Sequence, residues 1–181
     1  MPDAAQLARC VRCFDEVEKK KRYIDKAEAH RKLEHYCAYQ DRCHQEVRKK
    51  LIDLGCYGDD LEEVMAQLVV DNFLNEERFA RSYARGKFRI KGWGRMRIKR
   101  DLKQKQISEY CIRKAMEELE EFNYDERLVE VILKKNRLLR EPDMFKRKGK
   151  LAQFAMTKGF ETGLIWETVK RLHADGRLEG E

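Results

Sequence analysis

Apolar residues recur along this chain in three segments that share one spacing. The segments begin at Val47, Ile98 and Leu151, and in each of them the pattern continues at positions +4, +8, +14, +18 and +21. The residues at these positions are Val47, Leu51, Gly55, Leu61, Met65 and Leu68; Ile98, Leu102, Gln106, Ile112, Met116 and Leu119; and Leu151, Ala155, Gly159, Ile165, Val169 and Leu172. The first two positions indicate one face of a helix, and the last three indicate one face of a second helix. The pattern therefore predicts a repeated pair of helices.

The break between the two helices of each pair has its own pattern. Gly55 and Gly159 stand where a first helix would end in a left-handed cap, and Gln106 takes that place in the middle segment. The next residue is apolar in all three segments: Cys56, Ile107 and Phe160. We expect this residue to fill the corner between the two helices.

A further amphipathic helix precedes each pair, over residues 25–39, 76–88 and 125–139. The residues expected on their inward faces are Ala29, Leu33, Tyr36 and Cys37; Phe79, Ala80 and Tyr83; and Leu128, Val131, Ile132 and Leu138. The chain is therefore predicted to be all-α, a tandem repeat of three three-helix modules with an elongated or curved body. The expected modules are residues 27–75, 76–124 and 125–175. Residues 1–26 form an N-terminal extension, helical or disordered, and residues 176–181 form a tail.

Composition agrees with a helical protein. Charged residues make up 40% of the chain and apolar residues 42%, with only two prolines. No apolar run approaches the ~20 residues of a membrane span. The first residues contain acids and lack an apolar signal core, so we expect a cytoplasmic protein without a membrane partner.

Positive charge is concentrated in the middle of the chain. Residues 85–105 hold ten Lys or Arg and one acid, a local charge of +9 in a chain of net charge +7, so the remainder sums to −2. Such a patch is typical of a surface that binds phosphate or an acidic protein. Well-solvated helix faces would give the same composition, and this alternative stays open.

The predicted helix at 95–105 has distinct inner and outer faces. With Ile98 and Leu102 inward, Arg100 and Lys103 point outward, and Arg97 and Lys99 lie on the flanks. Met96 also falls on the outer face, which is unusual unless a partner covers it.

Trp93 stands between Gly92 and Gly94, in the predicted break at residues 89–94. The two glycines permit a tight or left-handed backbone there. The tryptophan is then either a cap that folds back over the helix corner or an exposed anchor for a partner, since Trp beside Arg is typical of interface hot spots.

Candidate catalytic and metal-binding residues are few. The chain has no Gly-rich phosphate loop, and no nucleophile–base set stands out, so we expect neither an enzyme nor a bound cofactor. The pair Cys10-x-x-Cys13 fits half a zinc site or a redox pair, and histidines 30, 35 and 44 lie near Cys37 and Cys43. No second Cys-x-x-Cys follows, so we expect no metal. Cys37, Cys56 and Cys111 occupy apolar positions and are expected to be buried.

Residues 73–108 resemble the RecX family of bacterial regulators of the RecA recombinase. The resemblance is carried by Glu77-Arg78-Phe79-Ala80, Tyr83, Gly92, Gly94, Ile98, Leu102, Lys105 and Ile107. The three-module layout extends it over residues 27–174, whereas the first 26 residues match nothing in the family pattern. In one departure, Gln106 replaces the usual glycine, which predicts an intact fold with a less sharp corner.

The resemblance implies a non-enzymatic protein that lodges in the groove of the RecA–DNA filament and inhibits or modulates recombinase and ATPase activity in homologous recombination and DNA repair. The residues expected to bind RecA or DNA are Arg85, Lys87, Arg89, Lys91, Trp93, Arg95, Arg97, Lys99, Arg100 and Lys103. We expect a monomer. The alternative is a stand-alone helical DNA-binding protein, which would bind duplex with a steep salt dependence and without RecA.

Overall fold

The structure is a computed structural model that describes residues 23–120 and 122–178. Within these ranges it contains nine helices and no strands, which confirms the predicted all-α class. No helix in the described part of the chain has the length and apolar character needed to cross a bilayer. Cys10, Cys13 and most of the expected N-terminal extension lie outside the described residues.

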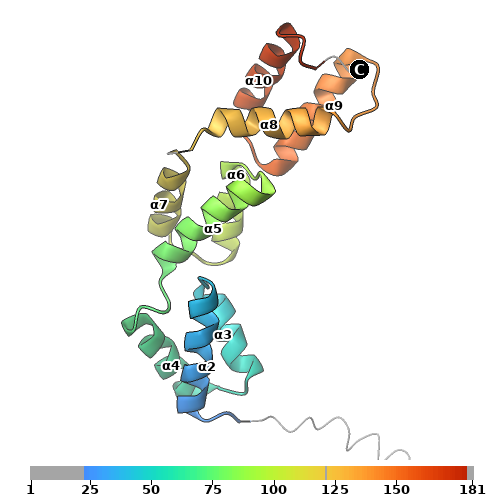
Figure 1. Ribbon diagram of the computed structural model, residues 1–181. Helices are drawn as coiled ribbons and strands as arrows, with labels where there is room; N and C mark the ends of the chain where they lie inside the picture. The colour runs from blue at the N-terminus through green and yellow to red at the C-terminus, as the bar shows by residue number, and fades with distance from the viewer. Residues whose placement is uncertain (1–22, 121, 179–181) are drawn as a thin grey trace, which may run out of the picture. The chain divides into compact units, whose positions relative to one another are not determined.

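The described chain divides into two compact units. The first comprises residues 23–40 with 46–74, and the second comprises residues 41–45 with 75–178. The helices follow one another in successive triplets (Figure 1). The three-module boundaries drawn from the repeat stay a prediction.

The first unit is built on α2 (Lys26–Tyr39), α3 (His44–Asp53) and α4 (Gly58–Val70). Asp25 caps α2 by accepting a hydrogen bond from the backbone N–H of Ala27, which satisfies one of the free donors of the first turn. Leu33, Leu51 and Leu68 come from the three different helices, and all are completely buried in one apolar cluster. The amphipathic stripes thus meet around a common core.

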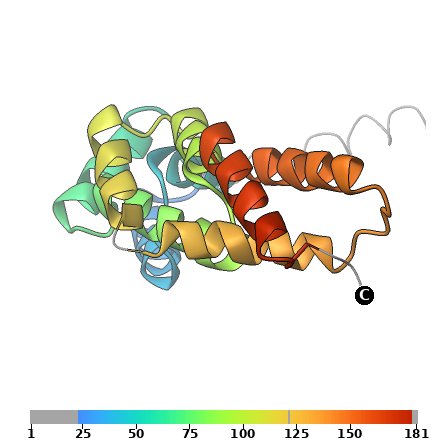
Figure 2. The same cartoon turned by 90° about the horizontal axis from the view of Figure 1, so that it is seen from above.

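The second unit contains two triplets around one continuous core. The first triplet is α5 (Glu76–Lys91), α6 (Arg95–Gln104) and α7 (Glu109–Glu120), and the second is α8 (Tyr124–Asn136), α9 (Met144–Lys158) and α10 (Thr162–Ala174). Figure 2 shows α8, α9 and α10, in orange and red, grouped beside the green helices. Asp41 is part of this unit, where it accepts hydrogen bonds from Arg78 (2.8 Å) and Ser82 (2.6 Å) of α5.

The repeated corners form as the sequence predicts. The corner residues Cys56, Ile107 and Phe160 are buried. Each donates its backbone N–H to the carbonyl five residues earlier, at 2.9, 3.1 and 3.3 Å. Gln106 adopts the left-handed backbone, with a φ of 58°, and Gly55 and Gly159 adopt it at 87°. The residue after Gln106 therefore donates the same corner hydrogen bond as the residues after the two glycines, so the expected loss of sharpness is not visible in the bonding.

Two local predictions are wrong. Residues 89–91 are not part of the break, because α5 continues to Lys91 and leaves only residues 92–94 between the helices. Leu138 does not face the core, because α8 ends at Asn136 and places Leu138 in the following loop, 74% exposed. The repeat positions are otherwise buried, apart from Gln106 and the half-buried Met116.

Candidate functional site

The break between α5 and α6 is built by its two glycines. Gly92 ends α5 in the left-handed conformation, with a φ of 60°, and Gly94 begins α6 in an extended one. The backbone N–H of Gly94 donates to the carbonyl of Lys158 at 2.8 Å, and the N–H of Met96 donates to the carbonyl of Gly159 at 3.0 Å. A Cβ atom on Gly94 would lie only 2.3 Å from the Gly159 oxygen. Gly94 is therefore needed where α6 meets the corner between α9 and α10.

For Trp93, the choice between a cap over the helix corner and an exposed anchor stays a prediction. Trp93 is half-buried and packs against the core of the second unit. The Lys87 ammonium lies 4.8 Å from the ring centroid and the Arg97 guanidinium 4.0 Å from it. Cations over an aromatic face are attracted by its negative potential. Trp93 thus orders two of the basic side chains around the start of α6.

Several predicted partner-binding residues are engaged within the protein. Arg85 pairs with Glu118 at 3.1 Å, and the Arg97 guanidinium donates to the Thr157 carbonyl at 3.0 Å. Arg95 lies 4.1 Å from the centroid of the Tyr124 ring, and Arg89 lies 4.3 Å from the centroid of the Phe122 ring. These four arginines stabilise contacts between elements, which reduces the basic surface that a partner can reach.

The outer side of α6 keeps its predicted character. Ile98 and Leu102 are completely buried, whereas Met96, Lys99, Arg100 and Lys103 are exposed and define what we call the α6 face. Lys103 pairs with Glu109 at 2.6 Å. The hydrogen bond from Lys103 lowers the pKa of Glu109 and keeps its carboxylate charged.

Lys99 and Arg100 have no ion-pair partner among the described residues. Lys91, at the exposed end of α5, has none there either. Within the described residues, these three exposed cations are thus in neither an ion pair nor a cation–π contact.

A groove of about 520 Å³ runs beside the α6 face, between α6 and the end of α9. Met96 and Arg100 line it from α6, and Met156 lines it from α9. Met96 is 54% exposed and Met156 is 39% exposed. Flexible methionines beside a cation suit a surface that adapts to a protein partner.

Tyr124 joins the two triplets, a role that its sequence position did not reveal. Its hydroxyl donates to Glu161 at 2.8 Å and accepts from the backbone N–H of Arg95 at 3.0 Å. Its ring stacks on Phe88 with the centroids 5.7 Å apart. Burial, reinforced by Glu161, raises the pKa of this phenol, so Tyr124 remains a neutral donor.

The suggested cysteine–histidine cluster does not form among the described residues. Cys37 and Cys43 are buried in two different apolar clusters. Cys56 and Cys111 are buried as the sequence predicts. The one group of metal-type donors found in the described chain is His30, Glu34 and Asp71, whose donor atoms lie within 4.8 Å of one another. His30 Nδ1 lies 3.5 Å from a carboxylate oxygen of Glu34, and its Nε2 lies 3.5 Å from one of Asp71.

The sequence prediction did not include a second basic stretch. Residues 134–150 hold eight Lys or Arg and two acids, a local charge of +6. The chain outside residues 85–105 has a net charge of −2, because acids elsewhere cancel the +6 of residues 134–150. The net charge of that remainder therefore conceals the second basic stretch.

Two family models match this chain: the second three-helix domain of RecX at residues 75–116 and the third three-helix domain of RecX at residues 123–169. The regulatory protein RecX of Salmonella paratyphi A is 31% identical over 134 residues, which cover 68% of this chain and 78% of that protein. The regulatory protein RecX of Prosthecochloris aestuarii is 28% identical over 137 residues, covering 76% and 88%.

Solved structures show the same fold. The crystal structure of RecX from Lactobacillus salivarius matches with a TM-score of 0.67 and 25% identity, over 82% of this chain and 97% of that one. A second crystal structure, of a regulatory protein RecX, matches with a TM-score of 0.69 and 24% identity, over 94% of this chain and 79% of that one.

The fold defines a class of protein: an all-α protein built from repeated three-helix units. Within that class, this chain belongs to the RecX family, and its relatives from Salmonella paratyphi A and Prosthecochloris aestuarii are named regulatory proteins.

Proposed function

We propose that this chain binds the RecA recombinase on its DNA filament and lowers its recombinase and ATPase activity without catalysing a reaction itself. The observation that carries the proposal is the α6 face of the second RecX domain, where exposed cations and Met96 adjoin the groove between α6 and the end of α9. RecA enters as the partner that the family resemblance implies.

The α6 face suits a filament because it combines two kinds of contact. Lys99 and Arg100 supply charge for carboxylates or phosphates, which steers association and selects the partner's sign. Met96 and Met156 supply apolar area next to that charge. A protein filament wrapped on DNA presents both carboxylates and phosphates, which the α6 face can contact. Inhibition would then follow because the bound protein occupies the groove of the filament.

The test reverses only the cations that the protein does not use internally. The variant is Lys91→Glu, Lys99→Glu and Arg100→Glu; Arg97 and Lys103 are kept because they make internal contacts. The matched control reverses three exposed cations of the first unit that have no ion-pair partner among the described residues: Arg31, Lys49 and Lys50.

RecA-driven ATP hydrolysis on single-stranded DNA is measured over a concentration series of each variant, together with its unfolding midpoint. We expect both variants to fold, because exposed charges contribute little to stability. The control should inhibit like wild type, and the α6 variant should need at least about tenfold more protein, since like charges across an interface repel.

Equal inhibition by the two variants would exclude the α6 face as the contact surface. Duplex binding by wild type without RecA, abolished by the same three reversals while RecA is unaffected, would support the stand-alone DNA-binding function instead.

A further inference from the structure

A cavity lined by four arginines lies in the last triplet, away from the α6 face. It has a volume of about 1150 Å³ and is bounded by the end of α8, the loop to α9, the start of α9 and the turn after α10. The arginines are Arg137, Arg140, Arg147 and Arg177. Glu141 is the one acidic residue of the lining, and it pairs with Lys150 at 2.5 Å. The cavity is therefore strongly positive.

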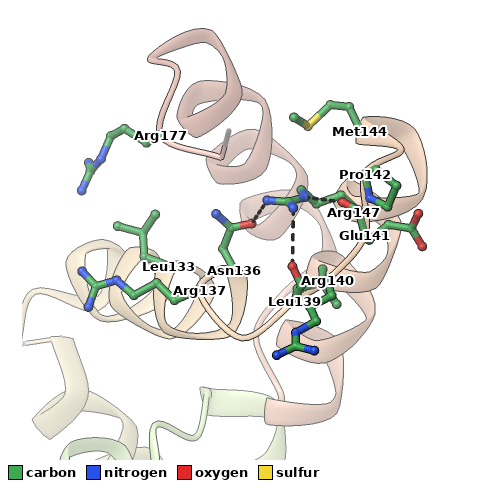
Figure 3. Close-up of a pocket in the computed structure, with 10 residues that line it drawn as sticks. All are labelled: Leu133, Asn136, Arg137, Leu139, Arg140, Glu141, Pro142, Met144, Arg147 and Arg177. Carbon is green, nitrogen blue, oxygen red and sulfur yellow. Dashed lines mark hydrogen bonds between the residues drawn. The ribbon is translucent and has the colours of Figure 1, made fainter. Parts of the chain in front are cut away.

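Arg147 gives this cavity a fixed charge. Its side chain is buried, and its guanidinium donates to four oxygens: the carbonyls of Glu141 (2.8 Å), Leu178 (3.0 Å) and Leu139 (3.4 Å), and the side-chain oxygen of Asn136 (3.2 Å). Figure 3 shows Arg147 held by Asn136, the Leu139 carbonyl and the loop around Glu141.

None of the four acceptors is an anion, and no carboxylate among the described residues pairs with Arg147. Removing a guanidinium from water is unfavourable unless an opposite charge compensates it. The cavity thus contains a pre-ordered positive charge that an anionic ligand would neutralise.

The other three arginines are exposed, and none has an ion-pair partner among the described residues. Figure 3 shows Arg137 and Arg177 extending to the same side of the cavity, whereas Arg140 lies on a different side. Arginines at several points of a concave surface suit a ligand with more than one negative charge, because each guanidinium can bind a phosphate through two N–H groups.

Apolar side chains lie among these charges. Leu133, Leu139 and Met144 also line the cavity. Phe145 directly follows Met144 in the first turn of α9 and is 87% exposed. An aromatic ring with so little cover, one residue along the chain from the cavity lining, can serve as a platform on which an unpaired base stacks.

We propose that this cavity binds a short stretch of single-stranded nucleic acid, with the arginines on its phosphates and Phe145 as a platform for a base. A duplex hides its bases from Phe145, and an acidic peptide would use the arginines but leave the ring and the apolar lining without a matching ligand. This site is additional to the RecA contact proposed for the α6 face, and its test contains no recombinase, so the two proposals can fail separately.

The first test compares two variants that lose the same number of positive charges. Arg137→Gln, Arg140→Gln and Arg177→Gln are combined, and the control combines Arg31→Gln, Lys49→Gln and Lys50→Gln, so that both variants have the same net charge. Binding of a labelled oligothymidylate is followed by fluorescence anisotropy between about 50 and 200 mM salt.

Each phosphate contact on a single strand contributes about 0.7 to the slope of log affinity against log salt concentration, so the cavity variant should lose a slope of about 2. The control should keep the wild-type slope. The comparison holds even if the α6 face also binds DNA, since both variants retain that face.

The second test concerns stacking. Phe145→Ala should weaken binding at least about fivefold, as removal of a stacking ring does. Tyr39→Ala is the matched control, because Tyr39 is also 87% exposed but belongs to the first unit. It should leave the affinity unchanged.

Thermal melts accompany both tests. The single substitution Arg177→Gln replaces the triple variant if the triple variant unfolds at a lower temperature than wild type. The proposal is overturned if wild type does not bind the oligonucleotide at 50 mM salt, if each variant and its control weaken binding equally, or if duplex DNA or polyglutamate competes as well as single-stranded DNA.

Discussion

Replacing Gly94 by alanine tests the contact that joins α6 to the last triplet. The added Cβ would lie 2.3 Å from the oxygen of Gly159, 2.5 Å from its carbonyl carbon and 2.6 Å from the nitrogen of Phe160. All three are backbone atoms, so no side chain can rotate away. The conformation of Gly94, with φ −84° and ψ 170°, is open to alanine, which confines the effect to this contact.

The size of the effect follows from the bonds that must stretch. Separating the two backbones weakens the hydrogen bonds from Gly94 to Lys158 (2.8 Å) and from Met96 to Gly159 (3.0 Å). Each hydrogen bond contributes about 0.5–1.5 kcal/mol to stability. Alanine offsets about 0.4–1 kcal/mol of that loss, because it lowers the conformational entropy of the unfolded chain. We expect a net loss of roughly 1–2 kcal/mol in the free energy of unfolding.

Gly86→Ala is the control, because Gly86 lies inside α5 and no heavy atom stands within 4 Å of the position of its Cβ. It should stabilise the protein by roughly 0.5–1 kcal/mol. Urea unfolding followed by circular dichroism compares the two variants. The contact would be disproved if Gly94→Ala proved as stable as wild type, or if both substitutions shifted stability in the same direction.

Three more predictions concern single residues. Leu102→Ala removes a completely buried side chain and should cost roughly 2–5 kcal/mol in urea unfolding, whereas Arg100→Ala on the exposed face should cost under about 0.5 kcal/mol; equal losses would mean that the helix is rotated. Gln106→Gly removes the strain of a left-handed residue with a φ of 58° and should stabilise the protein by about 1 kcal/mol in urea unfolding; a loss of stability would contradict this. Burial raises the pKa of Asp41, but hydrogen bonds from two α5 side chains outweigh it and leave the pKa below its ordinary 3.8. The stability that Asp41 provides is present above 3.8 and lost as pH falls through the lower folded value, so Asp41→Asn should flatten the acid side of a stability–pH curve.

The sequence alone determined the helices and their corners, because these depend on neighbours within a few turns. Ile98 and Leu102 lie four residues apart and are both completely buried, as one helix face requires. The corner at Gln106 forms from a hydrogen bond between residues five apart, from Ile107 to Leu102, so even an unusual residue did not disturb the repeat. The family resemblance rested on the same local pattern.

Tertiary structure decided which charges remain available. Arg97 and Lys99 look equivalent along the sequence, but Arg97 donates to Thr157, sixty residues away, while Lys99 stays exposed. Arg147 gains its buried position from acceptors on separate segments, including the Leu178 carbonyl. Periodicity reports which side of a helix is apolar, but the choice of a partner for each charge depends on segments that only folding brings together. The arginine cavity and the Gly94 contact are therefore properties of the packed triplets and not of any one helix.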